Sequence, residues 1–441
     1  MRLDKLTLDD IGPFRHLDLA FPRGQDDTRA DVHLLVGPNG SGKSTILEAL
    51  SQLFTAGHPG FAGRCRSPYA TAAVEARGET LAWSLARPKS RHLDWNGIRL
   101  ANAMNDGFPS HFGRVPGMVL HLTNRPWDEL LAKKARFQNQ HTLVFAYGSG
   151  RRLNTSHLAG VVNLTANPLA EAASFEKPES AGAFFQWILN VVAGRAIAAQ
   201  QGRDDKARQL GGSLARVKEA LRAVTGEQTV EFELNDELTG VIVVLGAQRV
   251  PHAQLPAGLV GLLSWVGDLI MRVDRLPWEG DAPFDEREFI LLLDEVEVHL
   301  HPAWQRRVLP MIERLFPRAQ VIAATHSPFI IQSASDAWVH RLAVEDGWSD
   351  ASPPIRGPIG ESYSAITQDI LGVDSEFSLA VEADWTTLRA LKERVLAGQA
   401  PKADFDALAK QLATRGEEIH RLVAVEVRQT ERQLALQRHV P

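Results

Sequence analysis

Residues 37–44 match a phosphate-binding loop. They read Gly-Pro-Asn-Gly-Ser-Gly-Lys-Ser and fit the pattern G-x-x-x-x-G-K-[ST]. A β-branched run at 32–36 precedes them and helical periodicity follows at 44–54, so the loop joins a predicted strand to a predicted helix. In such a loop the backbone N–H groups wrap a phosphate, Lys43 reaches the β- and γ-phosphates, and the Ser44 hydroxyl binds Mg²⁺. We therefore expect a nucleoside triphosphate such as ATP to contact Gly37, Pro38, Asn39, Gly40, Ser41, Gly42, Lys43, Ser44 and Thr45.

A predicted buried strand ends in two acids, which is the pattern of the second half of a nucleotide site. Residues 289–293 are apolar, and Asp294 and Glu295 follow them directly. In P-loop enzymes the first acid holds Mg²⁺, largely through water, and the second polarises the attacking water. An acidic strand end is common by itself, so this interpretation depends on the phosphate loop.

A histidine follows the next predicted strand. Thr325-His326-Ser327-Pro328 comes directly after the apolar run 321–324. Parallel strands end at one edge of a sheet, so we expect His326 near Asp294 and Gly37. This position suits a γ-phosphate sensor, and the alternative is a histidine that serves only a strand-end hydrogen bond.

His299 and His301 could be interpreted as a metal pair, because alternate residues of an extended chain share a face. No third ligand is evident in the sequence. A loop that borders the nucleotide is therefore the favoured interpretation.

The elements around these motifs indicate an α/β fold. Apolar residues alternate on both sides of Gly12-Pro13 and again around Gly78-Glu79, which predicts two β-hairpins. The order strand, helix, strand over 289–324, with continuously apolar strands, indicates a parallel sheet. Further elements are predicted as strands at 142–147, 229–234 and 241–245 and as helices at 258–270 and 302–315.

Two other regions have helical patterns. The segment 181–224 is interrupted by Gly194, Gly202 and Gly211-Gly212, and its length of about 45 residues is too short and too broken for a long antiparallel coiled coil. Beyond Gly357-Pro358 the chain is predicted to be helical to its end. Its core-facing stripe comprises Trp385, Leu388, Leu391 and Val395.

Composition narrows the class of protein. The 441 residues suffice for about two or three domains. Forty-eight Lys and Arg against fifty-three Asp and Glu give a formal charge of −5, which disfavours a surface that binds nucleic acid everywhere but leaves a local basic patch open. Cys65 is the only cysteine, so an intrachain disulfide and a Cys-rich zinc site are excluded. No apolar run reaches about 18 residues, so we expect a soluble cytoplasmic protein that does not bind membranes.

The motifs together resemble a known family. The phosphate loop, the run 292–305 (LLDEVEVHLHPAWQ) and the run 324–328 (ATHSP) look like the ABC-type ATPases of the RecF, SMC and OLD kind, particularly compact bacterial ATP-binding proteins that include Septu-type antiphage ATPases. The resemblance extends over the opening hairpin, residues 146–148 with Arg151, residues 184–187 and the tail after Ile370-Leu371. It implies an ABC-type ATPase head, a mixed sheet with a P-loop core, carrying a helical insertion and a helical tail.

The resemblance also implies that ATP drives dimerisation, with each nucleotide between one subunit's phosphate loop and the other's signature helix. Where the family has Leu-Ser-x-Gly, this sequence reads Leu255-Pro256-Ala257-Gly258. Gly258 leaves a helix N-terminus that could face a γ-phosphate, but Pro256 offers neither hydroxyl nor N–H. We therefore expect slow turnover. The family glutamine before the helical region could be Gln138 or Gln140.

The expected domain division follows from the motifs. An N-terminal ATPase lobe with the P-loop takes 1–150 and a helical insertion takes 151–228. A C-terminal ATPase lobe with Gly258, the acidic strand end and His326 takes 229–350, and the tail takes 351–441.

Two other classes fit less well. A transporter ATPase would need a membrane partner, and the Thr-His-Ser-Pro block is more typical of the RecF-like class. A built-in nuclease would need acids clustered on strands, whereas Glu382, Asp384, Asp404 and Asp406 lie in helical patterns.

The functional hypothesis is an ATP- and Mg²⁺-dependent ATPase, with Glu295 and His326 as catalytic residues and Ser44 and Asp294 as metal ligands. It would switch between nucleotide states as a homodimer or higher oligomer and control a separately encoded effector, a nuclease, in antiphage defence. The alternatives are a RecF-like ATPase of DNA repair or recombination, with possible DNA contact, and an ATP-gated scaffold that hardly hydrolyses.

Overall fold

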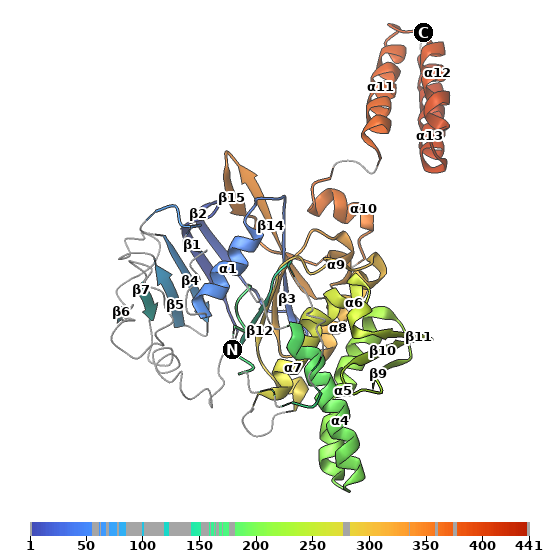
Figure 1. Cartoon of the computed structure of the whole chain (residues 1–441). Coiled ribbons are helices and arrows are strands. Elements are labelled where there is room, and N and C mark those ends of the chain that lie inside the picture. The colour runs from blue at the N-terminus through green and yellow to red at the C-terminus, as the bar shows by residue number, and fades with distance from the viewer. Residues whose placement is uncertain are drawn as a thin grey trace. The chain divides into compact units, whose positions relative to one another are not determined.

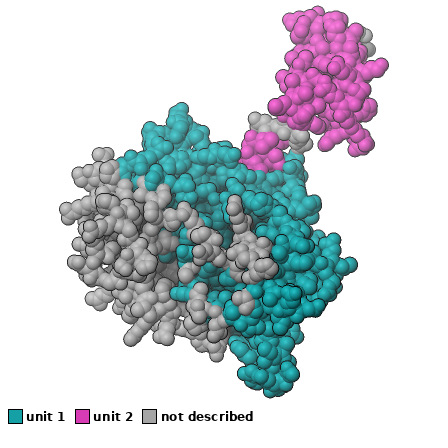
Figure 2. Space-filling view, viewed as in Figure 1, with its two compact units in different colours: residues 1–366 teal, residues 367–441 magenta. Residues whose placement is uncertain are grey.

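The computed structural model in Figure 1 forms two compact units, Met1–Ile366 and Thr367–Pro441, which Figure 2 colours teal and magenta. It describes residues 2–54, 61, 63–67, 70–76, 79–84, 99–100, 119–122, 143–150, 158, 160–162, 164, 167–169, 171–175, 181–276, 283–334, 336–357, 360–373 and 377–438. Within these residues no helix is both long and apolar enough to cross a bilayer.

A mixed sheet of seven strands is the centre of the first unit. Five neighbouring strands run parallel in the order β14-β3-β13-β12-β8, and β15 and β16 pair antiparallel with β14. The mixed sheet with a P-loop core that the family resemblance implies is confirmed. The strands are β3 (Asp31–Val36), β8 (Val144–Tyr147), β12 (Ile290–Leu293), β13 (Gln320–Ala324), β14 (Ala337–Glu345), β15 (Trp348–Ala351) and β16 (Ile355–Arg356).

The central strands are apolar because both faces of this sheet are covered. Every residue of β8, β12 and β13 is buried. Such continuous burial is typical of parallel strands under helices, and it explains why the apolar runs in the sequence predict β12 and β13 correctly. No strand is predicted for residues 337–351, yet β14 lies beside β3. The last residues of β14 are exposed, so the segment lacks a continuous apolar run.

A second sheet is antiparallel, in the order β2-β1-β4-β5-β7-β6. Both predicted N-terminal hairpins are confirmed by the pairs β1–β2 and β4–β5. At the first turn a Cβ on Gly12 would lie 2.7 Å from Thr45 Cγ2, so the close approach of the hairpin to the phosphate-loop helix needs glycine. The strands are β1 (Lys5–Ile11), β2 (Phe14–Ala20), β4 (Thr71–Ala76), β5 (Glu79–Ser84), β6 (Arg99–Leu100) and β7 (Val119–Leu122).

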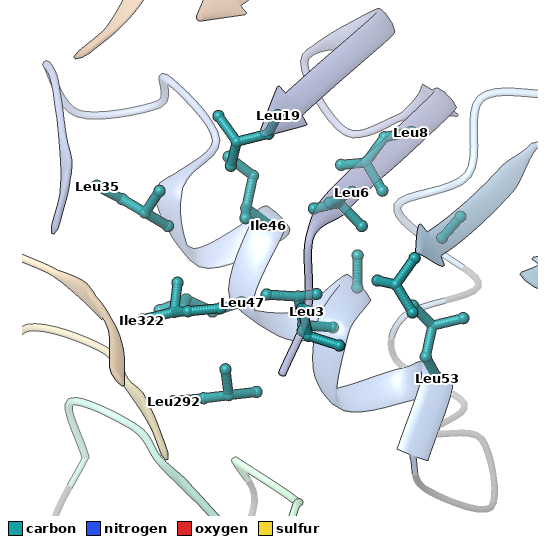
Figure 3. Close-up of a cluster of buried hydrophobic side chains, with 14 of the residues drawn as sticks. Leu3, Leu6, Leu8, Leu19, Leu35, Ile46, Leu47, Leu53, Leu292 and Ile322 are labelled. Atoms are coloured by element: carbon teal, nitrogen blue, oxygen red, sulfur yellow. The ribbon is translucent and has the colours of Figure 1, made fainter. Parts of the chain in front are cut away.

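Helix α1 (Lys43–Phe54) lies between the two sheets (Figure 1). Figure 3 shows its Ile46, Leu47 and Leu53 among side chains from both sheets, including Leu6 of the antiparallel sheet and Leu292 of the parallel one. Full burial of a leucine or isoleucine stabilises a fold by about 1.5–3 kcal/mol. This core therefore holds the N-terminus of α1, where the phosphate loop ends, in a fixed position.

A helical hairpin comprises α4 (Ala181–Gln200) and α5 (Asp204–Thr225). The turn lies at Gly202, whose φ is +69°. The expectation that Gly194 and Gly211-Gly212 also interrupt the helices is wrong, because both helices continue through them. A Cβ on Gly194 would lie 3.3 Å from Leu210 Cδ1, so this glycine allows the two helices to pack closely.

The remaining described elements of the first unit are a small antiparallel sheet and several helices. A three-stranded antiparallel sheet contains the predicted hairpin β9–β10, and the apolar helix after Gly258 is confirmed as α6 and α7 with a π-helical turn, Leu263–Gly267, between them. The elements are β9 (Val230–Leu234), β10 (Val241–Leu245), β11 (Gln248–Pro251), α6 (Ala257–Leu262), α7 (Asp268–Arg275), α8 (Pro302–Leu315), α9 (Pro328–Ser333) and α10 (Tyr363–Ala365).

The second unit is a bundle of α11 (Leu379–Leu396), α12 (Lys402–Ala413) and α13 (Glu417–Arg438). The predicted stripe on α11 is confirmed, since Leu388 and Val395 are buried and Trp385 and Leu391 pack against the same cluster. The cluster's buried members are Leu388, Val395, Phe405, Ala409, Leu412, Ile419 and Val423.

Two buried histidines join β3 to β14. His33 and His340 are completely inaccessible, and His33 Nδ1 lies 3.2 Å from His340 Nε2. Burial lowers the pKa of His340 to about 3, with a further lowering by His33. Burial also lowers the pKa of His33, although Asp31, 3.6 Å from its Nε2, opposes this and Arg2 reinforces it. Both rings are therefore neutral in the folded protein at pH 7.

We expect this pair to make the fold sensitive to acid. The unfolded chain takes up protons on histidine below pH 6.5, whereas folded His340 does not until about pH 3. Stability is therefore lost as the pH falls from about 6.5, at about 1.4 kcal/mol per pH unit for each such histidine, or about 2 kcal/mol by pH 5. Urea unfolding at pH 7.5 and pH 5.0 measures the difference. In His340→Asn the difference should shrink by about 2 kcal/mol, and an unchanged difference would contradict the assignment.

Candidate functional site

The phosphate loop joins β3 to α1, and its glycines adopt conformations that other residues rarely take. The φ angles of Gly37, Gly40 and Gly42 are +152°, +81° and +96°. A Cβ on Gly42 would lie 2.4 Å from the Phe14 ring, and a Cβ on Gly37 would lie 2.5 Å from the Leu342 carbonyl oxygen. A Cβ on Gly40 would meet nothing within 4 Å. The loop is thus closely packed at Gly37 and Gly42 and open at Gly40. This arrangement suits a loop whose N–H groups bind a phosphate.

Lys43 is hydrogen-bonded to two loop carbonyls and interacts electrostatically with three carboxylates. Its Nζ donates to the carbonyl oxygens of Gly37 at 2.9 Å and Pro38 at 3.0 Å. Burial lowers the pKa of Lys43, and the carboxylates of Asp294, Glu295 and Glu297 act in the opposite direction. The fold therefore brings the phosphate loop and the acidic strand end close together, although most of the first unit's sequence lies between them.

Asp294 and Glu295 stand where β12 ends. Leu293 pairs with Tyr147 of β8 and with Ala323 of β13, and the Asp294 N–H donates to the Tyr147 carbonyl oxygen at 2.9 Å. Glu295 has a φ of +47°, which is uncommon for a residue other than glycine. Such backbone conformations persist at functional sites because the surrounding structure holds them. The two carboxylates are half-buried at the edge of the sheet, as predicted from the strand end.

His326 lies at the same edge and is held there by Glu297. Glu297 Oε1 accepts from the His326 N–H at 2.6 Å, and Glu297 Oε2 accepts from Thr325 Oγ1 at 2.8 Å. The Thr325 N–H donates to the carbonyl of Leu35 at 3.2 Å. This bond connects the histidine loop, residues 325–328, to β3, the strand before the phosphate loop. Glu297 is a residue that the motif interpretation misses. The signal available for it was a third acid three positions after Asp294.

Ser327 fixes the other side of His326. Its Oγ accepts from the N–H groups of Phe329 and Ile330 and so caps α9, and it donates to Gln305 Oε1 at 2.6 Å. Gln305 in turn donates to the Leu300 carbonyl oxygen at 2.8 Å. The histidine loop is therefore held in place at β13, which it follows directly, and by the hydrogen bond to Gln305 of α8.

His299 and His301 lie in the turn before α8. His301 is the N-cap of α8, and its Nδ1 accepts from the Ala303 N–H at 3.2 Å. His299 has a φ of +64°. In the part of the chain that is described, no group of three or more His, Cys, Asp or Glu side chains is arranged to hold a metal ion.

Gly258 lies near the start of α6 and packs against that turn. A Cβ on Gly258 would lie 3.1 Å from both the His299 carbonyl oxygen and Trp304 Cζ3, and one on Gly261 would lie 3.4 Å from the Val298 carbonyl oxygen. The contacts of Gly258 are thus with the turn after the acids and not with the phosphate loop of the same chain. The N-cap position is Pro256, whose side chain makes no cap hydrogen bond.

A buried network connects α7 to the acidic strand end. Tyr147 Oη donates to Asp268 Oδ2 at 2.8 Å, and Arg272 Nε donates to the same oxygen at 2.6 Å. All three side chains are almost completely buried. Because Tyr147 also accepts from the Asp294 N–H, one residue contacts both the helix after Gly258 and the acid at the site. Sequence patterns gave no sign of this pairing, which depends on the register of β8.

Gln138, Gln140 and Arg151, which the sequence suggested as further family positions, lie outside the described residues.

Two AAA-domain families match segments that contain the site. An AAA-domain family described together with the AbiEii toxin of type IV TA systems matches residues 285–332, and a second AAA-domain family matches residues 1–64. The first segment contains Asp294, Glu295 and His326, and the second contains the phosphate loop.

Proteins similar in sequence include a Septu protein and a retron ATPase. Septu protein PtuA of Bacillus thuringiensis is 22% identical over 394 residues, which are 84% of this chain and 84% of that protein. The "Retron Ec83 probable ATPase" of Escherichia coli is 37% identical over 75 residues, 17% of this chain and 14% of that protein. Among solved structures, an SMC head bound to the C-winged helix domain of ScpA has a TM-score of 0.45 and 14% identity, covering 81% of this chain and 98% of that one.

The phosphate loop, the acidic strand end and these sequence matches are those of an AAA-type ATPase. Within that class the chain is related to Septu PtuA and to retron ATPases.

Proposed function

We propose that this chain hydrolyses ATP with Mg²⁺ and works as a nucleotide-driven dimer switch that controls a separately encoded effector nuclease in antiphage defence. The observation that carries the catalytic part is the electrostatic interaction of Lys43 with the carboxylates of Asp294, Glu295 and Glu297, together with the hydrogen bond from the His326 N–H to the same acidic loop. The similarity to Septu PtuA over most of both chains supports the defence role.

Each residue of the site has a distinct task in this proposal. The N–H groups of the phosphate loop and the Lys43 ammonium bind the phosphates and neutralise their charge. Glu295 accepts a hydrogen bond from the attacking water and orients it. As the water oxygen bonds to the γ-phosphorus, the bond from that phosphorus to the bridging oxygen breaks and ADP leaves, while Glu295 accepts the proton of the water. His326 contacts the γ-phosphate from the neighbouring strand end. The Ser44 hydroxyl and the Asp294 carboxylate are oxygen donors of the type that Mg²⁺ prefers, and bound Mg²⁺ would neutralise phosphate charge there.

The dimer would place Gly258 of one subunit against the nucleotide of the other. Pro256 and Ala257 are exposed at the start of α6, so this end of the helix is accessible to a second copy. The N–H groups of a helix start favour an anion such as a γ-phosphate. Since α6 packs on the turn after the acids, the two half-sites of such a dimer would be mechanically connected.

We expect Pro256→Ser to accelerate hydrolysis. The serine would restore the hydroxyl donor that the family resemblance places opposite the γ-phosphate. One preorganised donor is worth on the order of 10²–10³ in rate at comparable sites. Phosphate release under saturating ATP measures kcat, and the exposed Pro251 provides a matched control as Pro251→Ser. Equal rates for wild type and Pro256→Ser would mean that this segment is not the signature motif.

The domain division belongs to the same proposal. The P-loop would come from an N-terminal lobe (1–150), and Asp294, His326 and Gly258 would come from a C-terminal lobe (229–350) after a helical insertion (151–228). The tail is proposed as 351–441; Ile355–Arg356 pair with β14 of the first unit, and the second unit, Thr367–Pro441, is the part proposed to contact the effector.

The effector is proposed as a separate chain because the four acids considered for a built-in nuclease lie on helices. Glu382 and Asp384 are on α11, and Asp404 and Asp406 are on α12. Asp384 pairs with Arg415, and Asp406 pairs with Lys402. Asp384 and Asp406 are therefore engaged in salt bridges within the bundle, and no group of three or more His, Cys, Asp or Glu side chains among the described residues is arranged as the metal ligands of a nuclease would be.

The experiment uses purified full-length chain with ATP and Mg²⁺ or Mn²⁺ on plasmid, single-stranded DNA and RNA. We expect slow phosphate release and no cleavage. Cleavage should begin when the product of the adjacent reading frame is added, and it should change with ATP. Cleavage by the chain alone that disappears in Glu382→Ala or Asp404→Ala would instead indicate a self-contained, OLD-like nuclease.

A RecF-like role in DNA repair or recombination is the second candidate, because the family resemblance covers both groups. Two phenotypes of a deletion strain separate them. The defence role predicts more phage plaques and normal survival after DNA damage, whereas the repair role predicts the opposite pattern.

A further inference from the structure

Glu297 lies in the loop between the catalytic acids and α8. Its carboxylate accepts hydrogen bonds from a different segment, the histidine loop. Both of its oxygens accept hydrogen bonds there, from the His326 N–H at 2.6 Å and from Thr325 Oγ1 at 2.8 Å. Hydrogen bonds to an ionised carboxylate are shorter and stronger than neutral ones. The carboxylate is therefore a two-point clamp on the loop that carries the imidazole, with one bond from His326 and one from Thr325.

The backbone of Glu297 is itself held tightly. Its carbonyl accepts from the Leu300 N–H at 2.9 Å, and the Val298 N–H donates to the Glu295 carbonyl at 3.1 Å. Glu295 and His299 on either side both have positive φ angles. The loop is thus a rigid turn, so a shift at either end of it moves the Glu297 carboxylate.

The same turn is the surface on which α6 packs. The Cβ positions of Gly258 and Gly261 face the carbonyls of His299 and Val298. A chain of direct contacts therefore runs from α6, through the turn and the Glu297 carboxylate, to the backbone of His326. Thr325 Oγ1 extends it, since this hydroxyl also accepts from the Ser327 N–H at 3.0 Å.

We infer that Glu297 is a positioning residue that sets the place of His326 against the γ-phosphate and passes movement of α6 to it. This inference rests on the proposed function, in which His326 senses the γ-phosphate. Glu297 acts through His326, whereas Glu295 faces the attacking water.

Loss of the clamp should lower kcat by a larger factor than it changes the Kd for ATP. Glu297→Ala removes both acceptors and frees the histidine loop, and a displacement of about 1 Å at a reacting centre can cost about 10²-fold in rate. Glu297→Gln keeps a carbonyl oxygen for the His326 N–H, and its amide can donate to Thr325 Oγ1. We therefore expect Glu297→Gln to remain within about tenfold of wild-type kcat, and Thr325→Val, which removes one of the two bonds, to be similarly mild.

A double-mutant cycle with His326→Ala tests the inference. If Glu297 acts through His326, then Glu297→Ala has no further effect on kcat in the His326→Ala background. Single-turnover rates and the Kd for ATP are measured for all four proteins, and thermal unfolding shows which of them are folded. If Glu297→Ala fails to fold, the same cycle is run with Glu297→Gln and Thr325→Val.

Two results would overturn the inference while leaving the ATPase proposal intact. Additive effects of Glu297→Ala and His326→Ala would mean that Glu297 acts independently of the histidine. A loss in Glu297→Gln as large as that in Glu297→Ala would mean that the charge is required and not the clamp. If His326→Ala itself leaves kcat unchanged while Glu295→Gln abolishes turnover, the sensor role of His326 in the proposed function is wrong, and the inference is wrong with it.

Discussion

Lys43→Ala loses ATP binding, with the Kd raised by about 10²–10³-fold or more. Truncating one partner of a buried, hydrogen-bonded charge pair costs about 2–5 kcal/mol, and each 1.4 kcal/mol is a factor of about ten in Kd. The cost is large here because Lys43 faces the carboxylates of Asp294, Glu295 and Glu297. Without the ammonium these carboxylates would repel the triphosphate. Isothermal titration with ATP and Mg²⁺ measures the effect.

The control for this variant is Lys410→Ala, which changes an exposed lysine on α12 and should bind ATP as wild type does. Unfolding curves establish that Lys43→Ala is folded. A folded Lys43→Ala protein that binds ATP within about threefold of wild type would place the nucleotide elsewhere.

Glu295→Gln keeps ATP binding and loses hydrolysis, by about 10²–10⁴-fold. A general base or water-orienting carboxylate contributes about this factor to the chemical step, whereas the bound nucleotide gains little from it. The amide is nearly isosteric, so the backbone of Glu295 at φ +47° should be kept. Phosphate release and ATP affinity, measured together, separate the two effects. Glu345→Gln at the exposed end of β14 is the matched control.

The same variant reports on the dimer. If ATP is bound between two subunits and hydrolysis releases them, Glu295→Gln should remain a dimer for much longer than wild type after ATP addition. Size-exclusion chromatography with light scattering measures this directly. A variant that binds ATP yet stays in the oligomeric state of the nucleotide-free protein would contradict the sandwich dimer.

The parts of the site that the sequence predicted are those encoded by short runs of adjacent residues. A phosphate loop needs glycines because its backbone N–H groups must be accessible to the phosphate, and this requirement does not depend on the rest of the fold. The positive φ angles of Gly40 and Gly42 agree with this. Apolar runs at 289–293 and 321–324 predict buried parallel strands, because burial on both faces requires continuous apolar residues. Since parallel strands end at one edge, the placement of Asp294 and His326 at that edge followed from the same pattern.

The contacts that connect these motifs were decided only by tertiary structure. The clamp of Glu297 on His326 needs the turn at 295–299 to direct a carboxylate toward the end of β13, and no local pattern encodes that direction. The packing of Gly258 against His299 likewise depends on how α6 lies on the turn. Strand β14 escaped prediction because its sheet neighbours, and not its own periodicity, specify it.

The sequence by itself thus determined the chemical class of this protein, a P-loop ATPase, because phosphate binding needs particular residue types at fixed short spacings. Tertiary structure decided which groups act on one another: the three carboxylates around Lys43, the pair His33–His340, and the path from α6 to His326. The physical reason is that these interactions join residues far apart in sequence. Their geometry is set by strand register and by the packing of the core around α1, which no single segment specifies.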